Sequence, residues 1–136
     1  PDGARRIVAN SRMVRDEIVA GYDYPAERID IVPNGFDAPI VPPGLRELRR
    51  GELGIATDAF VALFAGSGWE RKGLRFAVEA ARQLPGVLLL AAGKGAPLSL
   101  RAPANVRFLG PRADLQPDFA AADVFILPTV YDPFSN

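Results

Sequence analysis

The segment between residues 66 and 73 has the residue types of an anion-binding loop. Its glycines allow backbone N–H groups to approach a ligand closely, and Arg71 and Lys72 add two positive charges. Arginine can hold two phosphate oxygens at once, whereas lysine acts as a point charge. The loop therefore predicts a cradle for a diphosphate.

Neither standard phosphate fingerprint fits this loop. In a P-loop the second glycine is followed by Lys and then Ser or Thr, but Gly73 is followed by Leu74 and Arg75. In a dinucleotide fold a third glycine would stand where Arg71 stands. A flexible turn with solvated charges therefore remains an equal alternative on chemistry alone.

Asp132 and Lys94 are further candidates for chemistry. Asp132 could orient a substrate hydroxyl or stabilise developing positive charge, but an aspartate before Pro133 is also a common turn residue, and alone the turn is favoured. Lys94 lies between two glycines and could touch phosphate, although a turn is the simpler role. Trp69 could stack on a ring, but a single loop tryptophan more often packs on its neighbours.

Alternating apolar strands and helices must position these residues. We expect strands at Phe60–Ala65, Val87–Ala92, Val106–Leu109 and Val124–Leu127, an amphipathic helix at Leu74–Leu84, and a helix capped by Asp114. This order predicts an α/β fold, a Rossmann-like parallel sheet with helices on both faces. The loops that follow the strands should meet at one rim of the sheet, where such folds bind ligands.

The first part of the chain reads as a separate βαβ segment. Strands are expected at Ile7–Ala9 and Ile29–Val32, with a helix that starts after Ser11 and stops at Gly21. The proline-rich residues 38–44 predict a linker and the domain boundary, and Leu45–Leu53 a short charged helix. Val124–Leu127 is expected to be a core strand with no covering helix after it, which suggests a piece of a longer protein.

The composition excludes several function classes. The sequence contains no Cys and no His, which removes disulfides, thiol catalysis, Ser-His-Asp triads and histidine metal sites. The formal net charge is zero, which argues against nucleic acid as a partner. No apolar run approaches the roughly 18 residues of a membrane span. The lack of Cys fits the cytosol.

Six segments, in this order and spacing, resemble the family 4 retaining glycosyltransferases (glycosyltransferase group 1) of the GT-B fold. The Gly-Ser-Gly-x-x-Arg-Lys-Gly version of the loop is similar to that of lipopolysaccharide core glucosyltransferases. The resemblance covers nearly the whole chain, and the segments are Ile7–Ser11, Ile31–Asp37, Phe64–Gly73, Leu90–Gly93, Val106–Gly110 and Ala122–Asn136.

The resemblance implies a two-domain enzyme with a cleft between Rossmann-like domains. Residues 1–38 would be the C-terminal tail of the acceptor domain, and residues 39–136 an incomplete donor-nucleotide-binding domain. The reaction would transfer a hexose, with retention, from a nucleotide-diphosphate sugar (a UDP-linked one is favoured) to a glycan or lipid-linked hydroxyl. The family implies no metal and no other cofactor.

The same resemblance assigns roles to individual residues. Arg71 and Lys72 would grip the donor diphosphate, and Asp132 would lie near the transferred sugar, although the family usually has Glu there. A second acid, eight residues after Asp132, would lie beyond Asn136. The remaining assignments are Gly66, Ser67, Gly68, Ser135 and Asn136 for the diphosphate, and Leu109, Gly110 and Pro111 for the nucleobase.

Two other functions stay open from the sequence. One is a non-catalytic nucleotide-binding α/β module, and the other an α/β domain used only for protein contacts. For the transferase, we expect the isolated chain to be inactive and the parent enzyme to be cytoplasmic. A lipid-linked acceptor would place that enzyme at the inner face of a membrane. The sequence does not fix the oligomeric state.

Overall fold

The computed structural model describes residues 3–35, 37–95 and 101–131, which belong to two compact units. The first unit contains the chain up to Ala38, and the second contains Pro39–Tyr131. The stretch that joins them includes the proline-rich residues 38–44, which form neither helix nor strand. Each unit therefore has its own secondary structure and its own packing.

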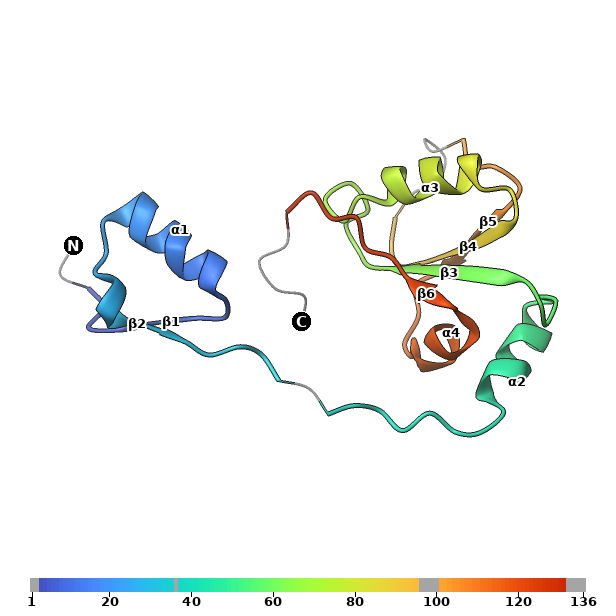
Figure 1. The fold of residues 1–136 in the computed structure, drawn as a ribbon, viewed down its shortest axis with the longest axis horizontal. Coiled ribbons are helices and arrows are strands. Elements are labelled where there is room, and N and C mark those ends of the chain that lie inside the picture. Colours follow the sequence, from blue (N-terminus) through green and yellow to red (C-terminus); the bar gives the residue numbers. More distant parts are fainter. Residues whose placement is uncertain (1–2, 36, 96–100, 132–136) are drawn as a thin grey trace. The chain divides into compact units, whose positions relative to one another are not determined.

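The first unit is a small β–α–β arrangement (Figure 1). The side chain of Ser11 caps its helix by accepting a hydrogen bond from the Val14 N–H at 3.2 Å. The predicted stop at Gly21 is wrong, because Asp23 instead takes the left-handed conformation that closes the helix (φ 49°). Its elements are β1 (Ile7–Ala9), α1 (Arg12–Tyr22), a 3₁₀ turn η1 (Ala26–Arg28) and β2 (Ile29–Ile31), with β1 and β2 parallel.

The second unit is a four-stranded parallel sheet between two helical layers (Figure 1). The strand order is β5-β4-β3-β6, and every pair of neighbouring strands runs parallel. Helix α3 covers one face, and α2 and α4 cover the other. The predicted Rossmann-like fold is therefore confirmed. Its elements are α2 (Leu45–Glu52), β3 (Phe60–Ala65), α3 (Leu74–Gln83), β4 (Val87–Ala92), β5 (Val106–Gly110), α4 (Gln116–Ala121) and β6 (Val124–Phe125).

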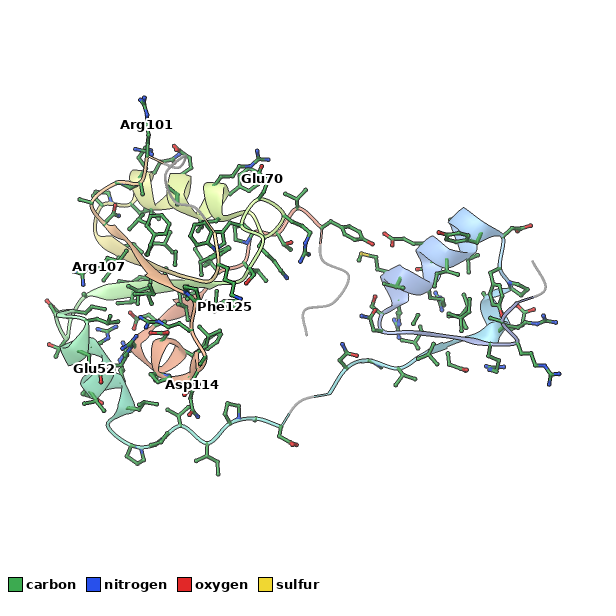
Figure 2. The ribbon with its side chains drawn as sticks, turned by 180° about the vertical axis from the view of Figure 1, so that it is seen from behind. Glu52, Glu70, Arg101, Arg107, Asp114 and Phe125 are labelled. Atoms are coloured by element: carbon green, nitrogen blue, oxygen red, sulfur yellow. The ribbon has the colours of Figure 1, made fainter. Side chains whose placement is uncertain are left out.

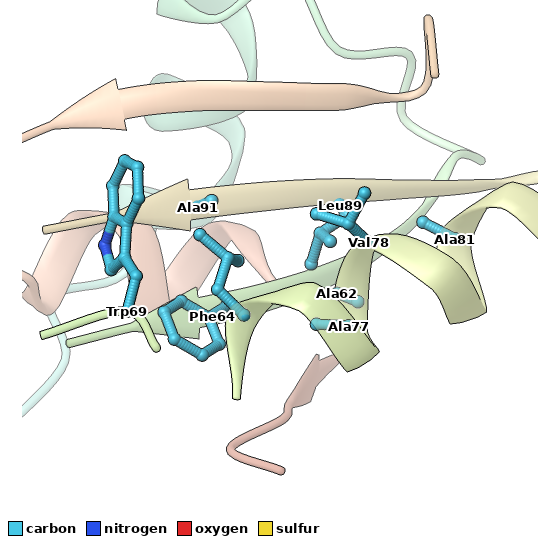
Figure 3. Close-up of a cluster of buried hydrophobic side chains, with 9 residues drawn as sticks. Ala62, Phe64, Trp69, Ala77, Val78, Ala81, Leu89 and Ala91 are labelled. Atoms are coloured by element: carbon cyan, nitrogen blue, oxygen red, sulfur yellow. The ribbon is translucent and has the colours of Figure 1, made fainter. Parts of the chain in front are cut away.

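The central strands bury both of their faces. Successive side chains of a strand point to opposite faces, so Ala62 and Phe64 of β3 pack under α3 while Val61 and Leu63 pack on the opposite side. Figure 3 shows the α3 side, with Trp69 and Ala91 at one end of the cluster and Ala81 at the other. This two-sided burial explains why the two central strands read as unbroken apolar runs.

Strand β6 is shorter and more exposed than the sequence suggests. Only Val124 and Phe125 form it, they pair with β3 alone, and they are 39% and 43% exposed. The expectation of a core strand over Val124–Leu127 is therefore wrong. The apolar run does continue the pairing by one bond, from the Ile126 N–H to the Leu63 carbonyl (2.9 Å), before Pro128 interrupts it.

A buried arginine fastens α2 to the sheet. Arg50 is only 3% exposed, and its guanidinium donates to backbone carbonyls and to Asp123. Asp123 also accepts from the Val61 N–H at 2.7 Å and pairs with Arg46. The pKa of the Asp123 carboxyl lies below its ordinary value, first because of the Val61 hydrogen bond and then because of Arg46 and Arg50. Asp123 is thus a structural anchor.

The edges of the unit are tied by further polar contacts. Arg107 of β5 donates from Nη1 to the Leu53 carbonyl at 2.6 Å, which joins the outer strand to the end of α2 (Figure 2). Asp114 accepts from the Gln116 N–H at 2.8 Å, but the N-cap position of α4 is Leu115, so the predicted cap lies one residue too early. Every helix in the described part of the chain is too short or too polar to cross a membrane.

Candidate functional site

The loop between β3 and α3 folds into a compact turn. The Lys72 N–H donates to the Gly68 carbonyl at 3.1 Å, and the Leu74 N–H donates to the Trp69 carbonyl at 3.0 Å. Gly73 has φ +75°, and a Cβ on it would lie 1.8 Å from the Pro128 carbonyl oxygen. Only glycine fits there, so the loop is held tightly against the segment that follows β6.

Backbone hydrogen bonds join the carboxyl ends of three strands. The Gly66 N–H, just after β3, donates to the Ala92 carbonyl at the end of β4 (3.0 Å). The Gly93 N–H donates in turn to the Gly110 carbonyl at the end of β5 (2.9 Å). The loops that follow β3, β4 and β5 therefore meet at one rim of the sheet, as the alternating pattern predicted.

Gly93 is a point of very close backbone approach in this rim. Its φ is +137°, and a Cβ would lie 1.9 Å from the Gly66 carbonyl oxygen and 3.1 Å from Trp69 Nε1. A Cβ on Gly95 would lie 2.4 Å from the indole ring. The two loops therefore touch through bare backbone, and the indole lies directly beneath them.

Trp69 supports the rim from inside. The side chain is 9% exposed, and its ring centroid lies 5.6 Å from that of Phe108 on β5. It belongs to the core cluster under α3 (Figure 3). The expectation that this tryptophan packs on its neighbours is confirmed.

A solvent-open hollow, here called the rim hollow, lies over these joined strand ends. Its volume of about 140 Å³ is smaller than the roughly 300–1,000 Å³ of pockets that enclose a whole ligand. Among the described residues, Lys94 and Arg112 are the charged residues that line it. Such a surface suits part of an anionic ligand. Its lining residues are Gly66, Ser67, Ala92, Gly93, Lys94, Pro111, Arg112 and Leu115.

The rim hollow unites some, but not all, of the residues predicted from the sequence. Gly66, Ser67 and Pro111 line it, and Gly110 lies behind it as the acceptor for the Gly93 N–H. Leu109 does not line the hollow but packs against the second core cluster, around Val61 and Leu63. Gly68 has φ +72° and open space around its Cα.

Arg71 and Lys72 do not line the hollow. Arg71 donates from Nη1 to the Tyr131 carbonyl at 3.1 Å, and its own carbonyl accepts from the Val130 N–H at 3.0 Å. The Lys72 Cγ atom lies 3.4 Å from the position of a Cβ on Gly66, so the stem of Lys72 runs beside the hollow's wall. The fold thus positions Lys72 beside the hollow and holds Arg71 against the segment that follows β6.

Three predicted site residues lie outside the described residues: Asp132, Ser135 and Asn136. In the described part of the chain, no group of three acidic or other metal-binding side chains is arranged to hold a metal ion.

Arg112 is the site residue that the sequence did not point to. It follows Gly110 and Pro111 at the end of β5, so its place at the shared rim could have indicated a role in the site. The sequence contains many arginines, however, and nothing in the local sequence distinguishes this one. Lys94, for which the sequence offers a phosphate contact or a simple turn, lines the hollow. Both residues reach the hollow because their strands end at the same level.

Comparison with protein families gives a match over much of the chain. Residues 59–136 match the family described as Glycosyl transferases group 1. This range includes the rim hollow and the whole sheet of the second unit.

Curated relatives are glycosyltransferases of greater length. The D-inositol 3-phosphate glycosyltransferase of Mycobacteroides abscessus is 30% identical over 148 aligned residues, which cover 98% of this chain and 33% of the relative. That of Paenarthrobacter aurescens is 40% identical over 80 residues, covering 59% of this chain and 20% of the relative. The chain therefore spans between a fifth and a third of these relatives.

Solved structures with the same fold include a glycosyltransferase and a protein crystallised with UDP and glucose. WaaG, a glycosyltransferase involved in lipopolysaccharide biosynthesis, superposes with a TM-score of 0.78 at 26% identity, over 94% of this chain and 39% of WaaG. Anabaena HepE, crystallised with UDP and glucose, gives a TM-score of 0.80 at 26% identity, over 96% of this chain and 40% of HepE. Both are similar to nearly the whole chain.

Proposed function

Because the chain belongs to the group 1 glycosyltransferase family, we propose that its second unit binds the nucleotide-diphosphate sugar used by a hexosyltransferase. The observation that carries this proposal is the rim hollow, where a glycine loop, two cations and three joined strand ends converge. The complexes of HepE with UDP and with UDP-glucose support a UDP-linked donor. Residues 1–38 would then be the end of the acceptor domain.

In this proposal the diphosphate binds along the β3–α3 loop. Backbone N–H groups of residues 66–68 and the side chains of Arg71 and Lys72 would face the phosphates, with Ser135 and Asn136 adding contacts. The nucleobase would lie against residues 109–111, with Pro111 as its contact inside the rim hollow. These assignments use the loop geometry and the family resemblance together.

The chemistry follows from how charge develops during transfer. Breaking the bond between the sugar and the diphosphate leaves negative charge on the departing phosphates and positive charge on the ring. Fixed cations at the phosphates stabilise that state without reorganising. We assign this role to Arg71 and Lys72, and we assign Asp132 to the side of the transferred sugar. The transfer would proceed with retention.

We propose that side chains alone meet the diphosphate charge, with no metal ion. The acceptor would be a glycan or lipid-linked hydroxyl, in line with the involvement of WaaG in lipopolysaccharide biosynthesis. The parent enzyme would act in the cytoplasm, with peripheral membrane binding decided by its acceptor. Titration of UDP with and without EDTA tests the first point, because chelation should leave the affinity unchanged.

A binding experiment tests the central proposal, since the chain spans only part of its relatives. The 136-residue chain is titrated with UDP and UDP-glucose, followed by calorimetry or by the fluorescence of Trp69, its single tryptophan. Arg71→Ala combined with Lys72→Ala should weaken binding by about 100-fold or more, because each charge-assisted contact contributes about 1.5–3 kcal/mol.

A charge-matched control separates specific contacts from general attraction. Arg75→Ala combined with Arg82→Ala also removes two positive charges, from α3 residues that pair with Glu70 of the preceding loop and with Glu79 of the helix. This control should keep the affinity for UDP. Equal losses in the two double variants would refute the assigned contacts, and a wild-type chain that binds no nucleotide would refute the proposed function.

A further inference from the structure

Asp118 of α4 holds a deeply buried carboxylate close to the rim hollow. Its side chain is 1% exposed. The Oδ1 atom accepts two hydrogen bonds from Arg49 of α2, at 2.9 Å from Nε and 2.7 Å from Nη2. The Oδ2 atom has no hydrogen-bond partner among the described residues. One half of this carboxylate is therefore satisfied and the other half is not.

The unsatisfied oxygen faces a residue of the hollow. The Nε atom of Arg112 lies 3.4 Å from Asp118 Oδ2. The Arg112 side chain is 30% exposed and lines the rim hollow, whereas the Arg49 side chain on the other side of Asp118 is only 15% exposed. Charges therefore alternate from α2, through α4, to the wall of the hollow.

A buried carboxylate is costly unless both of its oxygens meet donors or cations. Arg49 meets Oδ1, and Arg112 is the cation placed to meet Oδ2. The attraction acts on Arg112 in return, because it limits the many rotamers that a long side chain on a loop would otherwise sample. An arginine restrained in this way is already in place when a ligand arrives.

We infer that Asp118 is a positioning residue, which holds the Arg112 guanidinium at the wall of the rim hollow for a bound nucleoside diphosphate. The inference rests on the proposed function and deepens it. Asp118 does not line the hollow and acts through Arg112. Removal of its charge should therefore weaken nucleotide binding only while Arg112 is present.

A double-mutant cycle tests this dependence on the 136-residue chain, with UDP as the probe. Arg112→Gln and Asp118→Asn should each weaken binding by about tenfold or more, the loss of one charge-assisted contact. The double variant should bind no more weakly than Arg112→Gln alone. Asp114→Asn, a change of the same type in the loop that precedes α4, should keep the wild-type affinity. Additive losses in the double variant would overturn the inference.

A second measurement needs no ligand. The Arg112 Nε–H group should give a protected signal in ¹H–¹⁵N spectra, assigned by its absence in Arg112→Gln and lost in Asp118→Asn. A signal that persists in Asp118→Asn overturns the positioning role and leaves the proposed function standing. If the signal is lost but the wild type binds no UDP, the contact holds and the proposed function fails.

A third variant tests the inference even if the Asp118→Asn variant fails to fold. Arg112→Lys keeps the charge on the exposed side of the pair but has no Nε–H and no planar guanidinium. It should lose about as much UDP affinity as Arg112→Gln. Wild-type affinity in Arg112→Lys would show that the geometry held by Asp118 does not matter.

Discussion

Replacing Gly93 by alanine should distort the rim hollow and destabilise the second unit together. The new Cβ would lie 1.9 Å from the Gly66 carbonyl oxygen, and φ at this position is +137°, which side chains rarely adopt. The Gly66 carbonyl belongs to main chain that is tied to β4 by the Gly66–Ala92 hydrogen bond. It cannot turn aside as a flexible side chain could, so one of the two loops must shift.

The size of the effect follows from two contributions. A residue held in a sparsely populated backbone region costs about 1–3 kcal/mol. Extra volume forced into a packed site costs about 1–3 kcal/mol more. For a domain of this size about 1 kcal/mol lowers the melting temperature by about 4–8 °C. Gly93→Ala should therefore lower it by about 10 °C or more and weaken UDP binding as well.

Two other glycines serve as matched controls. Gly110 also has a positive φ (+71°), but its Cβ would meet nothing within 4 Å, so Gly110→Ala isolates the backbone strain. Gly86 has neither a positive φ nor a neighbour within 4 Å, so Gly86→Ala should be close to neutral. Thermal unfolding followed by circular dichroism compares the three. Equal melting temperatures for Gly93→Ala and Gly110→Ala would refute the close contact at Gly66.

Further predictions concern α2 and its anchors. Arg50→Met should cost about 3–5 kcal/mol in urea unfolding, because Asp123 and several carbonyls would lose a buried partner; a loss below about 1 kcal/mol would contradict the assigned network. The lowered pKa of Asp123 contributes stability above the unfolded-state value of about 4, and this stability is lost as the pH falls through the lower folded-state pKa. Asp123→Asn should therefore lose less stability than wild type over this acid range. Parallel curves of unfolding free energy against pH for the two proteins would contradict this role of Asp123. Gly51→Ala should raise stability by about 0.5–1 kcal/mol, since nothing lies within 4 Å of the added Cβ; a lower stability would show hidden crowding in α2.

The central strands could be predicted from the sequence because burial on both faces leaves a clear apolar signature. Phe60–Ala65 and Val87–Ala92 are observed with the predicted bounds. The same signature misled at Val124–Leu127, because an apolar run does not tell how many neighbours a strand has. Gly21 misled for a similar reason: glycine often ends helices, but here Asp23 took the left-handed position.

The sequence predicted where the site lies in the fold, but it did not predict all of the residues that form the site. Parallel strands put their carboxyl ends at one rim, so the meeting of Gly66 with Pro111 followed from the order of the elements. The role of Arg112 did not follow, because it depends on Asp118, which local sequence presents as an ordinary polar residue of a short helix. A side chain that matters through a buried partner has no local signature.

The backbone hydrogen bonds between the ends of β3, β4 and β5 also bear on how the chain folds. Gly66 reaches Ala92, and Gly93 reaches Gly110, only when all three strands are in register. A slip of one residue turns every side chain of a strand to the opposite face, and it would also break the rim. A nucleotide that binds there would therefore select chains with the correct register. At a free nucleotide concentration of about 100 times its Kd, binding would add about 2.7 kcal/mol to the stability of these chains.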